Sequence, residues 1–264
     1  MTEGITIAAT IQGISETYSV LEKLGVLDKV LTWIRLKKKT DIILLGASGA
    51  GKSTFRNEIF GIEGSISRFN RTSGTEKKEG KVEGELINII DTPGQSELNY
   101  TKQRQKAINS ASRSRRLGII NVVSYGYHEG IVDVKEAIDN GMPRTEYLSN
   151  RRTEEENQLP EWVDRLCGEG GSAQWIINLV TKADLWWGPG AEEEVLGHYL
   201  KGSFHTKLGE AQTNKYQVLP YSGEFKKFYG ITPMSGYYTD QDKNMHHNNL
   251  VATILSLCAS MEDM

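Results

Sequence analysis

A glycine-rich octapeptide near the start of the chain has the residue types needed to hold phosphate groups. Glycines let the backbone wrap closely, so that successive N–H groups point at phosphate oxygens. Lys52 would place a positive charge beside the β and γ phosphates, and Ser53 would offer its hydroxyl to Mg²⁺. The full match is Gly46, Ala47, Ser48, Gly49, Ala50, Gly51, Lys52 and Ser53, with Thr54 next. A short apolar run before it and a helical pattern after it favour a nucleotide-binding loop over a turn without a ligand.

A second polar group follows the apolar run Leu86–Ile90, where the chain reads Asp91-Thr92-Pro93-Gly94. A carboxylate at the end of a buried strand beside a phosphate loop is the usual second contact for Mg²⁺. Gly94 can offer its backbone N–H to a γ-phosphate with no side chain in the way. These residues also favour an ordinary turn, but the preceding phosphate loop makes the metal role the better interpretation.

A third group, Thr181-Lys182-Ala183-Asp184, follows the apolar run Trp175–Val180. The carboxylate of Asp184 can accept two hydrogen bonds from the N1–H and the exocyclic amine of guanine. Adenine lacks that donor pair, so a buried Asp184 would discriminate against ATP. The stem of Lys182 can lie against the base. Taken alone, this group could equally be a strand end with a helix-capping aspartate.

Together these groups, in this order, resemble the translation-factor-related class of P-loop GTPases, which holds the Ras-like and Era-like G domains. The resemblance implies an α/β three-layer fold with a mostly parallel central sheet. It also implies that GTP and GDP bind with Mg²⁺ and that GTP is hydrolysed slowly without a partner, as in a molecular switch. The chain departs from the family at Thr181, where Asn is commoner, and at Ser222-Gly223-Glu224, a loose match to the last guanine loop.

The resemblance further implies a switch threonine between the first helix and Asp91, and two candidates exist. Thr72 has a spacing similar to Era-like proteins, while Thr75 precedes a segment that also looks like a post-switch strand. We slightly favour Thr72, which would close on Mg²⁺ when the γ-phosphate is present. Gln95 stands directly after Gly94, where Ras-like proteins carry the glutamine that orients the attacking water.

The elements that must position these groups can be placed from the hydrophobic pattern. Short apolar runs alternate with helical patterns, which favours a parallel α/β sheet. We expect a loop over 61–80 and a polar helix over 95–116. The other expected strands are 41–45, 81–85, 86–90, 117–123, 175–180 and 217–221, and the other expected helices are 53–60, 191–208 and 250–261.

Two parts of the chain exceed a minimal domain of this class. Residues 1–40 carry two helical apolar faces and predict an N-terminal helical extension, which we expect to pack on the same chain or on a partner. Residues 41–264 would form the G domain. Within it, 126–172 is hard to assign and longer than its counterpart in minimal family members, so it could be an insertion that carries specificity.

The amino-acid composition limits which kinds of binding partner are expected. The 264 residues have a formal net charge of −3, so bulk electrostatics favour neither nucleic acid nor an anionic membrane, although peripheral membrane contact stays open. Two cysteines and no apolar run of membrane-spanning length fit a cytoplasmic protein. The expected partners are a guanine nucleotide and a protein effector or a second copy. An alternative is a GTP-dependent scaffold with incidental turnover, and a weaker one is an ATP-dependent P-loop enzyme.

Overall fold

The computed structural model describes residues 39–60, 75–82, 85–94, 98–130, 132–209, 215–225, 227–231 and 235–261. Nearly all of the helical extension expected over 1–40 lies outside these residues. Thr72 and Gln95 lie outside them as well.

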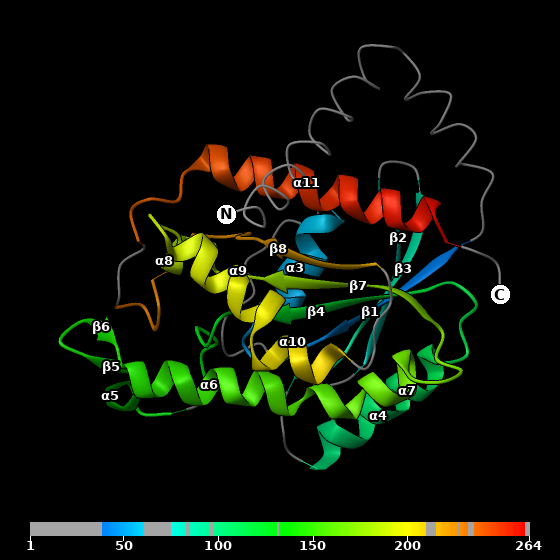
Figure 1. The fold of residues 1–264 in the computed structure, drawn as a ribbon, viewed down its shortest axis with the longest axis horizontal. Helices are drawn as coiled ribbons and strands as arrows, with labels where there is room; N and C mark the ends of the chain where they lie inside the picture. The colour runs from blue at the N-terminus through cyan, green and yellow to red at the C-terminus, as the bar shows by residue number, and fades with distance from the viewer. Residues whose placement is uncertain are drawn as a thin grey trace.

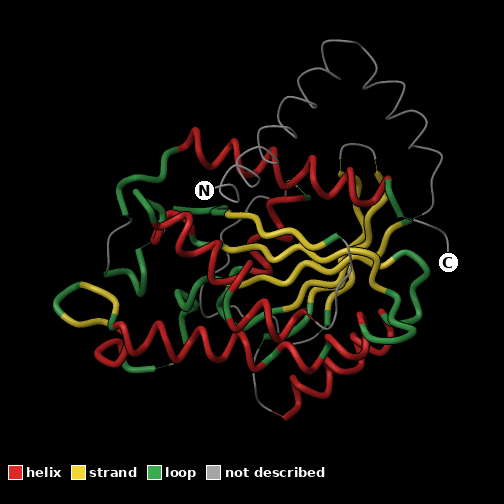
Figure 2. Tube along the Cα trace, viewed as in Figure 1, coloured by secondary structure: helices red, strands yellow, loops and turns green. Residues whose placement is uncertain are grey.

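The described residues form a six-stranded sheet with the strand order β2-β3-β1-β4-β7-β8 (Figures 1 and 2). Every neighbouring pair is parallel except β2–β3, which is antiparallel. The strands are β1 (Thr40–Leu45), β2 (Glu76–Val82), β3 (Glu85–Asp91), β4 (Leu117–Val123), β7 (Ala173–Val180) and β8 (Tyr216–Pro220). The expected α/β fold with a mostly parallel sheet is confirmed.

Helices cover both faces of the sheet (Figure 1). On one face α3 (Lys52–Ile59) and α11 (Asp240–Ala259) pack on Ile42, Leu44 and their neighbours. On the other face α4 (Leu98–Ala111), α7 (Val163–Cys167), α9 (Ala191–Lys201) and α10 (Ser203–Leu208) pack on Ile43, Leu45 and their neighbours. Successive side chains of a strand point to opposite faces, so a strand covered on both sides must be apolar throughout. This is why β1 from Ile42 onward and β4 apart from Asn121 consist of apolar residues and glycine.

The strand β2 corrects the expected loop over 61–80 and the expected strand 81–85. It begins at Glu76 and ends at Val82, and β3 then begins at Glu85. β2 is at the edge of the sheet and most of its side chains are exposed or half-buried. An edge strand with so little burial has no need of the apolar alternation that identifies strands in a sequence.

Several helices also differ from expectation. The helix expected over 191–208 is two helices, because the chain turns at Gly202 between α9 and α10. The helix expected over 95–116 ends at Ala111, and the closing helix begins at Asp240 rather than Leu250. Thr239 explains that early start, since its hydroxyl accepts from the backbone N–H of Asp242 while the Asp242 carboxylate accepts from the Thr239 N–H.

The described part of the segment 126–172, which leaves out residue 131, is largely helical. It contains α5 (Val134–Ala137), a hairpin of β5 (Ile138–Asp139) and β6 (Met142–Pro143), α6 (Thr145–Asn157), a 3₁₀ turn (Leu159–Glu161) and α7. The sequence pattern did not predict α6, because charged side chains surround most of this helix and leave no apolar stripe.

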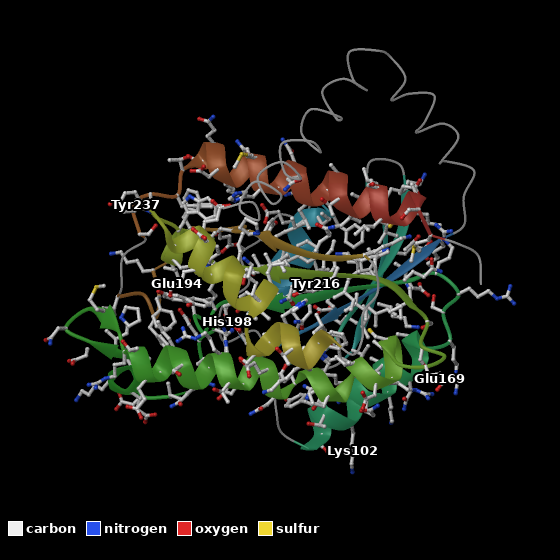
Figure 3. All side chains as sticks on the ribbon, viewed as in Figure 1. Lys102, Glu169, Glu194, His198, Tyr216 and Tyr237 are labelled. Atoms are coloured by element: carbon white, nitrogen blue, oxygen red, sulfur yellow. The ribbon has the colours of Figure 1, made fainter. Side chains whose placement is uncertain are left out.

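One contact ties α9 to the segment after β4. Glu194 and His198, both labelled in Figure 3, lie on α9. The Tyr125 hydroxyl donates to Glu194 Oε1 at 2.9 Å, and the Tyr125 ring lies 5.5 Å from the His198 ring.

Candidate functional site

The candidate site lies where the parallel strands end. Because β1, β3, β4, β7 and β8 are parallel, their carboxyl ends meet at one edge of the sheet, which is where ligands bind in open α/β folds. The glycine-rich loop follows β1, Asp91 ends β3, Thr181 follows β7 and Ser222 lies two residues beyond β8. The fold therefore brings the three sequence groups to the same edge.

The glycine-rich loop has backbone geometry that side chains would not allow. Gly46, Gly49 and Gly51 have φ angles of +123°, +79° and +103°. A Cβ on Gly46 would lie 2.0 Å from the carbonyl oxygen of Val122 on β4. Such positive φ angles are readily adopted only by glycine, and they let the loop curve back over the start of α3.

Lys52, at the first turn of α3, lies inside this curve. Its amine donates to the carbonyl oxygens of Gly46 and Ala47, each at 2.8 Å. Burial lowers the pKa of Lys52 to about 8; the charge of Asp91 opposes this shift and that of Arg104 adds to it. A cation held here without full solvation is well suited to pair with phosphate oxygens.

Asp91 lies fully buried at the centre of a polar cluster. Its Oδ2 accepts from the hydroxyl of Ser53 at 3.1 Å and from the guanidinium of Arg56 at 3.0 Å. Its Oδ1 has no hydrogen-bond partner among the described residues. Burial raises the pKa of Asp91, although Lys52 and Arg56 act in the opposite direction. A buried carboxylate oxygen without a donor, beside a serine hydroxyl, is an arrangement that accommodates a cation.

The turn after Asp91 packs directly on the glycine-rich loop. A Cβ on Gly94 would lie 2.5 Å from both Lys52 Nζ and the backbone nitrogen of Ser48, so glycine is required there. The buried Arg104 of α4 holds this turn by donating to the carbonyl oxygen of Pro93 at 3.1 Å. The same guanidinium forms two bonds with Glu161, at 2.6 and 2.7 Å.

Thr181 links the segment after β7 to the glycine-rich loop. Its hydroxyl lies 2.6 Å from the carbonyl oxygen of Ala50 and 2.9 Å from that of Val123. A threonine hydroxyl thus connects the end of β7 to the glycine-rich loop. Lys182 follows in the left-handed conformation, with φ +58°, and its amine donates to the carbonyl oxygen of Tyr127 at 2.6 Å.

Asp184 lies buried in the first turn of α8 (Ala183–Trp186). The hydroxyl of Ser222 donates to Asp184 Oδ1 at 2.5 Å. The loop after β8, at Ser222, is therefore in contact with the segment that carries Asp184. Its next residue, Gly223, approaches α3 closely, because a Cβ there would lie 2.2 Å from Glu58 Oε2 and 3.5 Å from Thr54.

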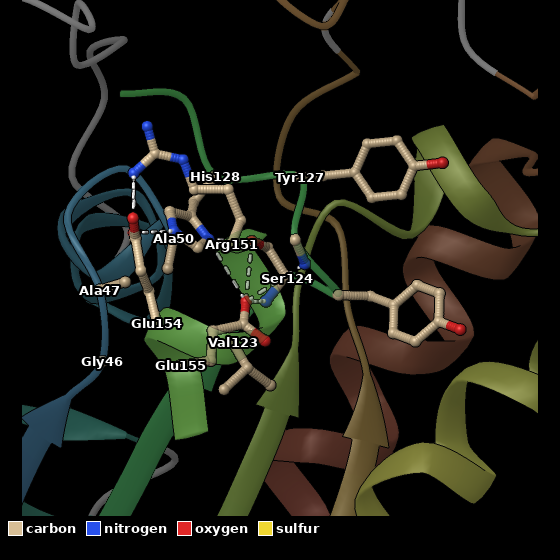
Figure 4. A network of polar contacts seen from close by, with 12 residues as sticks. Gly46, Ala47, Ala50, Val123, Ser124, Tyr127, His128, Arg151, Glu154 and Glu155 are labelled. Atoms are coloured by element: carbon tan, nitrogen blue, oxygen red, sulfur yellow. Dashed lines mark hydrogen bonds and ion pairs between the residues drawn. The ribbon is translucent and has the colours of Figure 1, made fainter. Parts of the chain in front are cut away.

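A network of buried polar side chains forms one wall beside the glycine-rich loop (Figure 4). Glu155 of α6 accepts from the Ser124 backbone N–H at 2.8 Å and from the Tyr199 hydroxyl at 2.7 Å, and His128 lies 3.4 Å from it. Burial raises the pKa of Glu155, but the hydrogen bonds from His128, Tyr199 and Ser124 outweigh it and hold that pKa below its usual range. The segment so held reaches the loop, since a Cβ on Gly49 would lie 2.6 Å from the carbonyl oxygen of Glu129.

The switch residues are only partly placed. Thr72 and Gln95 lie outside the described residues, whereas Thr75 is exposed and its hydroxyl donates to the carbonyl oxygen of Gln103 at 3.4 Å. In the described part of the chain no three His, Cys, Asp or Glu side chains cluster as metal ligands. Nor does any helix there have the length and apolarity to cross a membrane.

Sequence reasoning missed three residues of this site: Arg56, Arg104 and Glu155. Arg56 carried a usable signal, because it occupies the inward face of α3 with Phe55 and Ile59. A cation on an otherwise apolar face implies a buried acidic partner. Arg104 carried the same signal, because it shares its face of α4 with the buried Ala107, Ile108 and Ala111. Glu155 carried none, since α6 is polar nearly throughout.

A comparison with protein families gives a match for this chain. Residues 41–155 match the family described as 50S ribosome-binding GTPase. This match, with the phosphate loop and sheet above, identifies the chain as containing a P-loop GTPase G domain. A comparison with the curated proteins found no match.

Solved structures with the same fold include Toc33 from Arabidopsis thaliana. Its dimerization-deficient mutant is 15% identical with a TM-score of 0.52, and its complex with GDP and Mg²⁺ is 17% identical with a TM-score of 0.51; each alignment covers 97% of this chain and 94% of that one. A third structure, from work on dimerization and GTPase activity of the chloroplast translocon components atToc33 and psToc159, is 15% identical with a TM-score of 0.54 and covers 96% and 92%. These likenesses support the G-domain fold.

Proposed function

We propose that this protein binds GTP and GDP together with Mg²⁺, and hydrolyses GTP to GDP and phosphate as a nucleotide-dependent switch. One observation carries the proposal: the phosphate loop, the carboxylate of Asp91 and the pair Asp184–Ser222 converge at one sheet edge. Along this edge the strands run β3-β1-β4-β7, so Asp91 and the phosphate loop follow neighbouring strands, and Asp184 follows a strand two places beyond the loop. This spacing suits a nucleotide whose phosphates and metal lie at one end and whose base lies at the other. The proposed G domain spans 41–264, with 126–172 as an insertion.

The residues present fit a magnesium ion. Mg²⁺ prefers oxygen ligands, keeps several waters and is bound through one or two protein groups plus phosphates. Ser53 and Asp91 offer a hydroxyl and a buried carboxylate 3.1 Å apart, and Asp91 Oδ1 has no donor within the described chain. Ser53 and Asp91 would hold the ion, which neutralises charge on the β and γ phosphates when bound.

The remaining roles fall to residues around the phosphates. Lys52 and the loop amides would pair with phosphate oxygens, and the Gly94 N–H would meet the γ-phosphate. Thr72 or Thr75 would close on the metal in the GTP state, and Gln95 would orient the attacking water. Loss of the γ-phosphate would release the loops on either side of β2 and β3, which is how hydrolysis becomes a signal.

Guanine selection would depend on Asp184. Its position in the first turn of α8, with the Ser222 hydroxyl on one carboxylate oxygen, keeps the side chain oriented. Guanine presents two donors to a carboxylate on this edge and adenine does not, so Asp184 would favour guanine. The ATP-dependent alternative is therefore the weaker one.

A binding comparison tests the proposal. We expect GTP and GDP to bind at least about a hundred-fold more tightly than ATP. Asp184→Ala should remove that preference, whereas Asp164→Ala, an exposed aspartate on α7, should leave it intact. If the Asp184→Ala protein binds GTP as tightly as the wild type does, the guanine role of Asp184 is refuted. If the wild-type protein releases no phosphate from GTP, hydrolysis is refuted.

A second candidate is a GTP-dependent assembly protein with incidental turnover. Its support is that two of the structurally similar G domains come from work on dimerization of Toc33 and psToc159. Two measurements distinguish the two candidates. Dimers seen by light scattering with a non-hydrolysable GTP analogue, or a specific hydrolysis rate that depends on protein concentration, would favour the assembly protein. Cytoplasmic location and a protein effector belong to the switch proposal.

A further inference from the structure

Arg56 is a buried cation beside the proposed metal site. It lies on α3 one turn after Lys52, with only 9% of its surface exposed. The neighbouring inward positions of the helix are apolar, at Phe55 and Ile59. Burying an arginine in such a face is unfavourable unless carboxylates compensate its charge.

Two carboxylates meet its guanidinium. Arg56 Nη1 donates to Asp91 Oδ2 at 3.0 Å, and the same nitrogen contacts Glu76 Oε2. The Asp91 oxygen that it uses is also the one that Ser53 contacts. Arg56 thus occupies one side of the carboxylate that, with Ser53, would hold the metal.

The two carboxylates differ in their surroundings. Asp91 is fully buried, whereas the Glu76 side chain is 55% exposed. Glu76 and Asp91 are paired residues in the antiparallel ladder between β2 and β3, so both stay within reach of Arg56. The guanidinium can keep Glu76 as a partner when its bond to Asp91 is lost.

A divalent cation at Ser53 and Asp91 would face the positive charge of Arg56 a few ångströms away. Like charges repel, and burial leaves little solvent to screen them. Either Arg56 weakens the binding of the cation, or it withdraws from Asp91 toward Glu76. Both effects tie the occupancy of the metal site to the start of β2, which directly follows Thr75.

We propose that Arg56 sets the Mg²⁺ affinity of the site: it competes with the cation for Asp91, and it releases Asp91 and keeps Glu76 as its partner when Mg²⁺ binds. This inference rests on the proposed function, because it requires Mg²⁺ at Ser53 and Asp91. Glu76 is the acceptor that makes the exchange feasible without leaving a buried charge unpaired.

The test measures Mg²⁺ binding rather than turnover. The full chain is loaded with a fluorescent GDP analogue, and its rate of release is recorded as MgCl₂ is increased. Arg56→Met keeps an unbranched side chain for packing and removes the guanidinium with its charge; it should lower the apparent Mg²⁺ dissociation constant about ten-fold. Lys77→Met is the matched control, because it removes one charge from the adjacent strand position, whose exposed side chain points to the other face of β2.

The opposite variant should shift affinity the other way. Glu76→Gln removes the alternative partner and should weaken Mg²⁺ binding about three-fold, and its exposed position makes it safe for folding. If Arg56→Met binds the analogue with unchanged or weaker Mg²⁺ affinity, the inference is wrong. If Arg56→Met does not fold, Glu76→Gln decides, and unchanged or tighter Mg²⁺ binding overturns the inference. A wild-type chain that binds no GDP analogue would refute the proposed function itself.

Discussion

The buried carboxylate of Glu155 offers a quantitative test of how the wall of the site is held. Glu155→Gln keeps the size of the side chain but replaces one acceptor oxygen by an NH₂ donor. In the wild-type protein the two carboxylate oxygens of Glu155 accept from the backbone N–H of Ser124 at 2.8 Å and from the hydroxyl of Tyr199 at 2.7 Å, and His128 lies beside them. A glutamine can satisfy the Ser124 N–H with its oxygen, which then also faces His128, but it turns its NH₂ toward the Tyr199 hydroxyl and carries no negative charge.

The expected loss can be estimated from these contacts. A hydrogen bond to a charged group contributes about 1.5 to 3 kcal/mol, and a buried group left without its partner costs about 1 to 3 kcal/mol. Since one such bond is kept in neutral form and one is lost, we expect the free energy of unfolding to fall by about 3 kcal/mol. With a urea slope of about 3 kcal/mol per molar, the midpoint should move down by about 1 M.

Equilibrium unfolding in urea at neutral pH measures this change. Glu146→Gln is the matched control, because Glu146 is an exposed residue in the first turn of the same helix, α6. It should lose no more than about 0.5 kcal/mol through the helix dipole. A Glu155→Gln protein as stable as the control would show that the network in Figure 4 does not hold this wall.

Three further predictions concern backbone, catalysis and pH. Gly46→Ala should abolish GDP binding and lower the melting temperature, because its Cβ would meet the Val122 carbonyl at 2.0 Å; Gly141→Ala, with φ +79° but open space, should cost only about 1 to 2 kcal/mol. Gln95→Ala should slow single-turnover phosphate release at least about ten-fold without changing GDP affinity, and a native rate would exclude the water-positioning role. Burial lowers the pKa of His246 to about 4, so this side chain binds fewer protons in the folded than in the unfolded state. Stability should therefore fall as pH drops from about 6.5 to about 4, and less so in His246→Gln, as urea midpoints would reveal.

The buried strands could be predicted because a strand buried on both faces consists mostly of apolar residues. β1 and β4 are covered on both faces, so they read as apolar runs whatever surrounds them. β2 and α6 were not predictable from the sequence. An edge strand and a charged helix are held by partners distant in sequence, so no local apolar pattern identifies them. The Arg56–Glu76 ion pair and the Glu155–Ser124 bond, for example, join positions 20 and 31 residues apart.

The chemistry of the site divides in the same way. The sequence by itself was enough to propose the phosphate loop, Asp91, Gly94 and the pair Lys182 and Asp184, because the roles proposed for them depend on residue type and short spacing.

Only the tertiary structure decided how these groups are surrounded. It placed the hydroxyl of Thr181 on the carbonyl oxygen of Ala50 and that of Ser222 on the carboxylate of Asp184. It also set the cation of Arg56 against Asp91. Each of these contacts depends on which strand ends become neighbours, and neighbours in a sheet are set by topology and packing rather than by local sequence.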